Sequence, residues 1–489
     1  MFCLEGIQED IIEELAGELN ATLDLQPWDK YHCVAFDEIH IRQNLVFNKR
    51  SGEMLGYVHL GTPDEELAAM DRLLAVEVEG NQGEDVPPIA NKMLCFMVTG
   101  ITKVNNVKAV IGCFATRNLS KEMLSSIVWD VIGALELRGL AVLALVCDGA
   151  GVNHGFFQMQ PPLKPEEIWR KEEPKTESGV VFCTMNIYAH GRPLYLLNDP
   201  PHLLKTARNC LYSSGQVTKK RKEKGKDAVR LMMKNGQKIV WDTVVKLYDL
   251  NKDDTIRMLY KLNQEAVYLN SYSKMNVSLA ARVLSRSMAE VIRNLKWSDC
   301  TELGKFCEVM NDLFDMLNGA NSYQHIRTRN ELFKPYSSLD DDRFQEFEQI
   351  LGYFDEWVEE SKSSAGDKTA QAKRTLSPQT LHGIERTIRG FAGAVCFILK
   401  EAEGSSIPPS ISAQRFSQDD LEHYFGKVRA RFGGNRHPEG HQIVTNLTTT
   451  FVQRNLALRG RKKGSTAVNR AVFSEEELSK PLPKRGRKK

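Results

Sequence analysis

The chain has 489 residues, enough for about three domains, and its composition is that of a globular protein, with 42% hydrophobic and 26% charged residues. Its formal net charge of +2 conceals three basic stretches, at residues 219–238, 415–463 and 480–489, which suit a polyanionic partner. No apolar run reaches the ~18 residues of a membrane span and the N-terminus lacks a signal-peptide layout, so we expect neither a membrane protein nor a secreted one.

The ten cysteines include no CxxC pair, which argues against a zinc ribbon or a disulfide framework. Several of them lie inside apolar runs, as Cys147 and Cys396 do, and are expected to be buried thiols in a reducing compartment. We also find no N-terminal zinc finger with Cys/His ligand spacing.

The first segment, residues 1–28, predicts one amphipathic helix that ends before Pro27. Its apolar positions recur every four residues among acidic and amide residues: Ile7, Ile11, Leu15, Leu19 and Leu23. This helix could pack on the body of the protein or pair with a second copy, as a remnant of a dimerisation segment.

A strand is predicted over residues 33–41, CVAFDEIHI, with Asp37 and Glu38 in its middle, where acids are disfavoured. A hairpin with its turn at residues 49–52 follows, and then an acidic surface loop, residues 62–88, with a short helix at 65–76. Two further strands are predicted at residues 93–101 and 109–114. The acids inside the first strand therefore call for a functional explanation.

A helix capped by Ser120 runs to Gly139, and the apolar run LAVLALVC leads directly into Asp148. Such a run predicts a strand buried on both faces, with a carboxylate at its C-terminal end. Three strands, a helix and a strand, with acids on the first and last strands, is the layout of the ribonuclease H-like fold. A further strand at residues 193–198 ends in Asp199, and a helix begins near Leu203.

Between about residues 215 and 409 strand signals vanish, and helical periodicity dominates at 244–262, 275–295, 303–317 and 344–358. We therefore predict an α/β core in two parts, residues 29–215 and 412–455, interrupted by an all-α insertion at 216–411 and followed by a basic tail at 456–489. The last part begins with SQDDLEHYFGKVRARFGG, a helix with Ser417 as its N-cap and Gly433 and Gly434 at its end. From Phe451 onward we expect fraying.

Asp37, Asp148 and Glu422 form the candidate catalytic and metal-binding triad. Phosphodiester cleavage and joining use two divalent metals, and Mg²⁺ prefers carboxylate oxygens. Asp199 could replace one of the three, although an acid before Pro-Pro at a helix start is more often a cap. His202 and His423 could touch phosphate or the shell of the third carboxylate, or they could serve helix packing.

Six segments of the chain resemble P-element-type transposases, including the THAP-domain transposases of animals. They occur in family order between about residues 30 and 455: FDEIHI, LVCDGAGVN, LLNDPPHLLKTARN, SKMNVSLAARVLS, LFDMLN and SQDDLEHYFGKVRARFGGNRHP. The resemblance implies an RNase H-like, DDE-type catalytic core interrupted by a helical GTP-binding insertion. It assigns Asp37, Asp148 and Glu422 as the triad, with Mg²⁺ or Mn²⁺ as the metal.

The resemblance also implies scattered nucleotide contacts, and these are Lys261, Lys274, Ser285, Asp315 and Asp419. Lysines would meet phosphate, and Asp315 could accept hydrogen bonds from a guanine edge. The chain has no GxxxxGK[ST] loop, and the NKxD-like run at Asn251–Asp254 is short enough to arise by chance. We expect GTP to act in assembly rather than to be hydrolysed.

Double-stranded DNA, as transposon ends and target, is the expected macromolecular partner, in a homo-oligomer. The basic stretches suit DNA phosphates, and Arg429 and Arg431 follow Glu422 closely. The terminal PKRGRKK indicates a nuclear localisation signal or a nucleic-acid tail. The alternatives are a domesticated, non-catalytic DNA- or protein-binding nuclear protein, and a ribonuclease H-like nuclease that cleaves without joining.

Overall fold

The structure, a computed structural model, describes most of the chain. The described residues are 5–22, 24–48, 53–58, 88–172, 178–216, 230–253, 257–295, 298–320, 323–364, 366, 368–432 and 437–461. Several predicted features lie outside them: the turn at 49–52, nearly all of the acidic loop 62–88, most of the basic stretch 219–238, Gly433, Gly434 and the tail 480–489.

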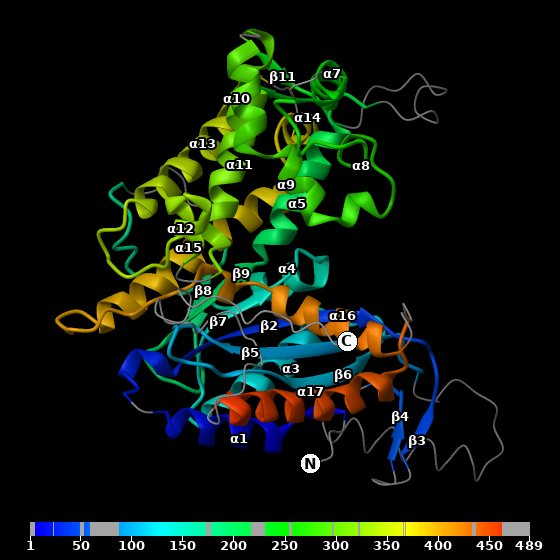
Figure 1. The fold of residues 1–489 in the computed structure, drawn as a ribbon, viewed down its shortest axis with the longest axis vertical. Helices are drawn as coiled ribbons and strands as arrows, with labels where there is room; N and C mark the ends of the chain where they lie inside the picture. The colour runs from blue at the N-terminus through cyan, green and yellow to red at the C-terminus, as the bar shows by residue number, and fades with distance from the viewer. Residues whose placement is uncertain are drawn as a thin grey trace, which may run out of the picture.

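A seven-stranded sheet in the order β1-β6-β5-β2-β7-β9-β8 forms the centre of the α/β part (Figure 1). Its strands are β1 (Gly6–Ile7), β2 (Tyr31–His40), β5 (Lys92–Gly100), β6 (Lys108–Thr116), β7 (Ala141–Cys147), β8 (Cys183–Met185) and β9 (Pro193–Asn198). Strands β5 and β6 continue antiparallel from β2, whereas β2, β7 and β9 run parallel. The predicted hairpin is present as β3 (Val46–Asn48) and β4 (Glu53–Leu55).

Both faces of the sheet are covered, as the apolar runs predicted. In β2, Cys33 and Ala35 enter one hydrophobic cluster, while Val34 and Phe36 enter the other. All seven residues of β7 are buried. Because successive side chains of a strand point to opposite faces, a strand in the middle of such a sheet must be apolar throughout. An acid near its end is then a conspicuous exception.

Helices from both ends of the chain pack on this sheet. The predicted N-terminal helix is present as α1 (Glu9–Asn20). Ile7 is not part of it: it belongs to β1 and pairs with Gly112 of β6. Leu23 lies outside the described residues. The apolar side of α1 is buried against β6 and α3 (Lys121–Glu136), so within this chain it packs on the body. Ser120 caps α3 as predicted, by accepting a hydrogen bond from the backbone N–H of Met123 at 3.2 Å.

The insertion rises as a helical body above the sheet (Figure 1). It is reached through α5 (Pro200–Ser213) and contains α7 (Trp241–Lys252), α8 (Gln264–Val267), α9 (Val277–Val283), α10 (Arg286–Leu295), α11 (Thr301–Leu317), α12 (Gln324–Thr328), α13 (Arg343–Ser364) and α14 (Lys368–Arg374). Two predicted helices were too long: the one at 244–262 stops at Lys252, and the one at 275–295 divides at Leu284 and Ser285. A small hairpin, β10 (Met232–Lys234) and β11 (Gln237–Ile239), is added to this otherwise helical part.

Helix α15 (Pro378–Glu401) falls in the span predicted as insertion, yet it packs along β9 and β7. Two glycines permit the close approach. A Cβ on Gly390 would lie 2.6 Å from the carbonyl oxygen of Leu196, and one on Gly393 would lie 2.5 Å from the Tyr195 ring. Helix α15 therefore joins the insertion to the sheet through backbone contact that side chains would prevent.

The last part of the chain returns to the sheet as α16 (Asp419–Arg431) and α17 (Gly440–Arg461), which lie over β2, β5 and β6. The prediction that Ser417 is the N-cap of α16 was wrong by one residue, because Gln418 occupies that position. The expected fraying from Phe451 was also wrong, since α17 continues to Arg461. Among the described helices, none combines the length and apolarity needed to cross a bilayer.

Candidate active site at the carboxyl edge of the sheet

Three neighbouring parallel strands each deliver an acid to the same edge of the sheet. Asp37 lies near the end of β2, Asp148 directly follows β7 and Asp199 directly follows β9. Register fixes their proximity, because Ala35 is opposite Val146 and Cys147 is opposite Asn198. The carboxyl ends of parallel strands form a shared rim, so these acids converge despite their separation in sequence.

Asp37 and Asp148 oppose each other electrostatically. Burial, followed by the negative charge of Asp148, raises the pKa of Asp37 to about 7, while the backbone N–H of Glu38, donating to Asp37 at 2.8 Å, has a smaller opposite effect. A carboxyl held this far above its ordinary pKa resists ionisation unless positive charge comes close. The pair is thus arranged to gain from a cation.

Asp148 is held by its own loop and by the next strand. Its Oδ1 accepts from the Asn153 amide at 2.6 Å and from the backbone N–H of Ala150 at 2.9 Å, at the start of α4 (Gly151–Met159). Its backbone carbonyl accepts from the Asn198 amide at 3.2 Å, and Arg386 of α15 donates to the other side of that amide at 2.9 Å. The sequence analysis did not identify this support, although Asn198 stands in the LLNDPPHLLK motif.

Asp199 has its acceptors already used. Its side chain is 1% exposed and caps α5: Oδ2 accepts from the backbone N–H and the ring Nδ1 of His202, at 3.1 and 2.8 Å. Oδ1 accepts from the backbone N–H of Gln418 at 2.8 Å. This is the capping role that the sequence favoured, extended to a second element 219 residues away.

Gln418 fixes the helix that carries Glu422, and no local sequence pattern indicated this role. Its side chain is fully buried and donates from Nε2 to the carbonyl oxygen of Phe36 in β2 at 2.5 Å. The start of α16 is therefore attached to Phe36, the residue before Asp37. Both of these bonds, to Phe36 and from Gln418 N–H to Asp199, orient the first turn of α16 toward the acid-bearing rim.

Glu422 also interacts electrostatically with these acids, and His202 and Lys205 act on it as opposing positive charges. Its Oε1 is 3.9 Å from Nδ1 of His202, and its side chain is 46% exposed. Burial raises the pKa of Glu422, and His202 and Lys205 oppose that effect. Burial likewise lowers the pKa of Lys205, against the charges of Glu422, Asp199, Asp148 and Asp37.

No group of three His, Cys, Asp or Glu side chains close enough to hold a metal ion occurs among the described residues. The chemistry of the set nevertheless fits a hard divalent cation, because carboxylate oxygens are the ligands that Mg²⁺ prefers. The pKa of Asp37 is raised by burial and then by the charge of Asp148, and a bound cation would oppose both effects.

Two family models match parts of this chain. The model described as "TNP-like, RNase H N-terminal domain" matches residues 3–159, and that described as "TNP-like, GTP-binding insertion domain" matches residues 201–330. The curated Transposable element P transposase of Drosophila melanogaster is 23% identical over 327 residues, which is 65% of this chain but only 36% of that protein. The chain belongs to the P-element-type transposase family.

The fold agrees with this family. The solved Drosophila P element transposase strand transfer complex is similar with a TM-score of 0.65 and 20% identity, over 93% of this chain and 83% of that one. The predicted architecture, an RNase H-like α/β core interrupted by a helical insertion, is therefore confirmed. The matched region spans about a third of the curated relative's length, so the activity of that whole protein is not thereby assigned to this chain.

Within the insertion of this P-element-type chain, a hydrogen-bond network surrounds Asp315, one of the predicted nucleotide residues, and reaches the residue that follows Ser285. The Asn311 amide donates to Asp315 at 3.0 Å and accepts from the backbone N–H of Arg286, which follows Ser285, at 3.2 Å. Asn330 also donates to Asp315, at 2.9 Å. Burial raises the pKa of Asp315 to about 6, with these two amides opposing the shift.

Asp419 connects to the same end of α11. Gln414 donates to Asp419 at 3.1 Å, and the backbone N–H of Gln414 donates to the carbonyl of Gly319, just beyond α11, at 3.1 Å. Lys274 and Lys261 are not joined to this network: their ammonium groups lie over the rings of Tyr212, at 4.6 Å, and of Tyr260, at 5.6 Å.

Arg208 of α5 ties the turn of Lys274 to the helix that begins in the active site. It is fully buried and donates to the carbonyls of Ser273 and Lys274 at 3.1 and 3.0 Å. The first two residues of the NKxD-like run make contacts within the chain. Asn251 accepts from the backbone N–H of Leu259 at 2.9 Å, and Lys252 pairs with Asp249 of the same helix at 2.9 Å. Asp254 lies outside the described residues.

Of the two arginines predicted to approach DNA, Arg431 is engaged within the chain. It donates to Asn446 and Gln453 of α17. Arg429 is half-buried on the same helix. Arg431 thus holds α17 against α16, a structural contribution that the spacing after Glu422 did not indicate.

Proposed function

We propose that this chain is a DNA transposase that cleaves phosphodiester bonds and joins the resulting 3′-OH to target DNA. One observation carries the proposal: Asp37, near the end of β2, and Asp148, directly after the adjacent parallel strand β7, are a mutually repelling pair, and Gln418 attaches the Glu422 helix beside them. Unbalanced charge of this kind costs stability and is typical of sites with chemical work to do. Membership of the P-element-type family supports the same reading.

Asp37, Asp148 and Glu422 would hold Mg²⁺ or Mn²⁺. When bound, the ions would activate the attacking oxygen and stabilise the leaving oxygen. The protein's own contribution is orientation: Asn153 and Ala150 hold the Asp148 carboxylate, and Gln418 holds the start of α16. His202, fixed by Asp199, stands beside Glu422 and restricts where that side chain can turn. Lys205 adds positive charge for an incoming phosphate.

We further propose that GTP binds the insertion as an assembly cofactor, through Lys261, Lys274, Ser285, Asp315 and Asp419. Asn311 bridges Asp315 and the backbone of Arg286, the residue after Ser285, which supports a shared site for these two residues, and the lysines would meet phosphates as point charges. Binding of a fluorescent, non-hydrolysable GTP analogue should fall at least tenfold in Asp315→Ala. Unchanged affinity would remove Asp315 from the site.

The wider setting is part of the proposal: transposon ends and target as double-stranded DNA partners, a homo-oligomer, and action in the nucleus. The domain boundaries proposed are 1–28, 29–215, 216–411, 412–455 and 456–489. Helix α15 lies inside the proposed range 216–411, yet it packs along β9. The end of the insertion is therefore in direct contact with the core.

Strand transfer tests the proposed reaction. Short DNA duplexes ending in a free 3′-OH would be incubated with supercoiled plasmid, Mg²⁺ and GTP, using wild type and Glu422→Ala. Pre-cleaved ends remove the need for the first cleavage. We expect joined products from wild type and at least a hundredfold less from the variant, since loss of one metal ligand removes transition-state stabilisation.

Two other outcomes would reject this function. Cleavage without joining would indicate a nuclease of the same fold. Absence of joining, together with no change in melting temperature on adding Mn²⁺, would favour a domesticated, non-catalytic DNA- or protein-binding protein.

A further inference from the structure

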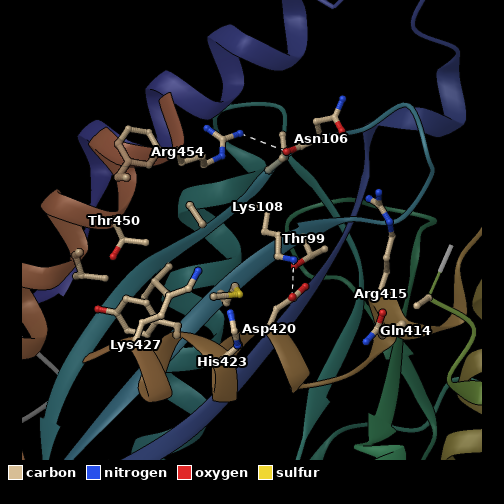
Figure 2. Close-up of a pocket in the computed structure, with 18 residues that line it drawn as sticks. Thr99, Asn106, Lys108, Gln414, Arg415, Asp420, His423, Lys427, Thr450 and Arg454 are labelled. Carbon is tan, nitrogen blue, oxygen red and sulfur yellow. Dashed lines mark hydrogen bonds and ion pairs between the residues drawn. The ribbon is translucent and has the colours of Figure 1, made fainter. Parts of the chain in front are cut away.

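A second feature of α16 lies on the side away from His202. A cavity of about 600 Å³ opens between α16, α17 and the strands β5 and β6 (Figure 2). His423 and Lys427, one helical turn apart on α16, contribute to its wall. Because residues 422 and 423 are about 100° apart around the helix axis, the cavity begins where the active-site side of α16 ends.

The wall of the cavity is strongly basic. It carries Lys108, Arg415, Lys427 and Arg454, and only Asp420 as an acid. Asp420 is already paired with Lys108. Arg454 pairs with Glu18 at 2.8 Å, outside the cavity.

With Lys108 and Arg454 engaged in ion pairs, Arg415 and Lys427 are the other two cations of the wall. The Arg415 guanidinium donates to the backbone carbonyls of Gly100 and Asn105, which fixes it in place; burial lowers the pKa of Arg415, and the charge of Asp420 opposes that shift. Lys427 is exposed at the rim. Figure 2 places Arg415 and Lys427 at different ends of the cavity, so each could meet a phosphate of a bound strand as a separate cation.

The rest of the lining is mixed, and this narrows the class of ligand. Apolar surface comes from Met97, Val110, Tyr424, Leu447 and Phe451, and hydrogen-bonding groups come from Thr99, Gln414 and Thr450. The volume falls within the ~300–1,000 Å³ usual for small-ligand pockets. A concave site of this size admits one unpaired nucleotide, with its phosphate toward the cations and its base or sugar toward the apolar wall, but not a duplex.

We propose that this cavity binds an unpaired DNA nucleotide that flanks the phosphodiester bond presented to Glu422. The inference rests on the proposed transposase function and extends it, because it assigns a strand-holding site on the neighbouring side of the helix that bears the third acid, about 100° around its axis. Binding is through phosphate charge and nonspecific apolar contact, so it is salt-dependent and reads no sequence.

Fluorescence anisotropy with a labelled oligothymidylate tests the proposal on the full chain. Lys427→Ala should weaken binding at least fivefold and reduce the salt slope by about 0.7, the value of one phosphate contact on a single strand. Thr450→Trp should weaken binding similarly without altering charge, because it fills the cavity. Lys362→Glu on α13, an exposed lysine of the insertion paired with Glu359, is the matched control and should bind like wild type.

The Mn²⁺-induced change in melting temperature separates this proposal from the proposed function. Lys427→Ala and Thr450→Trp should retain that change, which also shows that they are folded. Strand affinity unchanged in both variants, or no binding of the oligonucleotide by wild type, would overturn the cavity assignment even if Glu422→Ala abolishes strand transfer. Equal loss in Lys362→Glu would also overturn it, since general charge rather than the cavity would then be responsible.

Discussion

Two partly buried aspartates, one in each region of the molecule, show opposite ways of treating a buried charge. Asp37, on the sheet, faces Asp148, and its pKa rises to about 7. Asp315, in the helical insertion, receives two amide hydrogen bonds, and its pKa rises to about 6. Burial is the largest cause of both shifts. The second cause differs: at Asp37 it is the charge of Asp148, which adds to burial, whereas at Asp315 two amide hydrogen bonds oppose burial. We therefore predict that an added cation would stabilise the sheet edge more than the insertion.

The largest effect should come from Asp37→Asn. We expect strand transfer to fall at least about a hundredfold, because the neutral amide is a poor ligand for a hard cation. In metal-free buffer at pH 8, the same variant should be about 1–3 kcal/mol more stable, since it removes the repulsion from Asp148. Urea unfolding and the plasmid-joining assay measure the two quantities.

Glu38→Gln provides the matched control for that variant. Glu38 is the next residue of β2, on the opposite face, and its carboxylate is already compensated by Lys92 at 2.7 Å and Thr116 at 2.9 Å. It should lose stability and keep strand transfer within a fewfold of wild type. A stability gain in Glu38→Gln equal to that in Asp37→Asn would contradict the comparison.

The stability of the metal-free protein should fall as pH rises from about 4 to about 7. Asp37 has a higher pKa folded than unfolded, so the native state binds more protons over this window, and ionisation costs up to about 4 kcal/mol. Saturating Mn²⁺ should recover that loss above pH 7 in wild type but not in Asp148→Asn. Melting curves across the pH range decide this, and a Mn²⁺ effect of the same size in Asp148→Asn would exclude the sheet edge as the binding site.

Gly390→Ala probes the contact between the two regions. Its new Cβ would meet the Leu196 carbonyl at 2.6 Å, and backbone cannot give way as a side chain can. We expect a loss of about 1–3 kcal/mol in the free energy of unfolding. Gly352→Ala on α13, where a Cβ meets nothing within 4 Å, should not destabilise the protein. Equal effects of the two would show that α15 does not need this close approach.

Asn330→Ala should have the smallest effect, about 1–2 kcal/mol of stability at pH 8, because it deprives the Asp315 carboxylate of one of two donors. The loss should shrink below pH 5, where Asp315 is protonated. A loss independent of pH would mean that the hydrogen bond to Asp315 does not account for the contribution of Asn330, and that packing or its cap bond from the Leu332 N–H does.

Much of the sheet could be predicted from local pattern. Strands β2, β5, β6, β7 and β9 lie where the apolar runs indicated, and so does the helix capped by Ser120. Asp37 and Asp148 were noticeable because each interrupts or ends an apolar strand. Helix limits in the insertion were less predictable: apolar periodicity continues across the break at Leu284 and Ser285, where the chain turns from α9 into α10.

The sequence by itself thus determined which segments are strands and helices, and which acids stand out within them, because burial of alternate or periodic side chains is written in neighbouring residues. Only the tertiary structure decided which polar groups meet. The bond between Asp199 and Gln418 spans 219 residues, that between Gln418 and Phe36 spans 382, and the basic cavity forms only where α16 and α17 fold back over β5 and β6. Such contacts depend on how the insertion returns the chain to the sheet, and no local pattern encodes that closure.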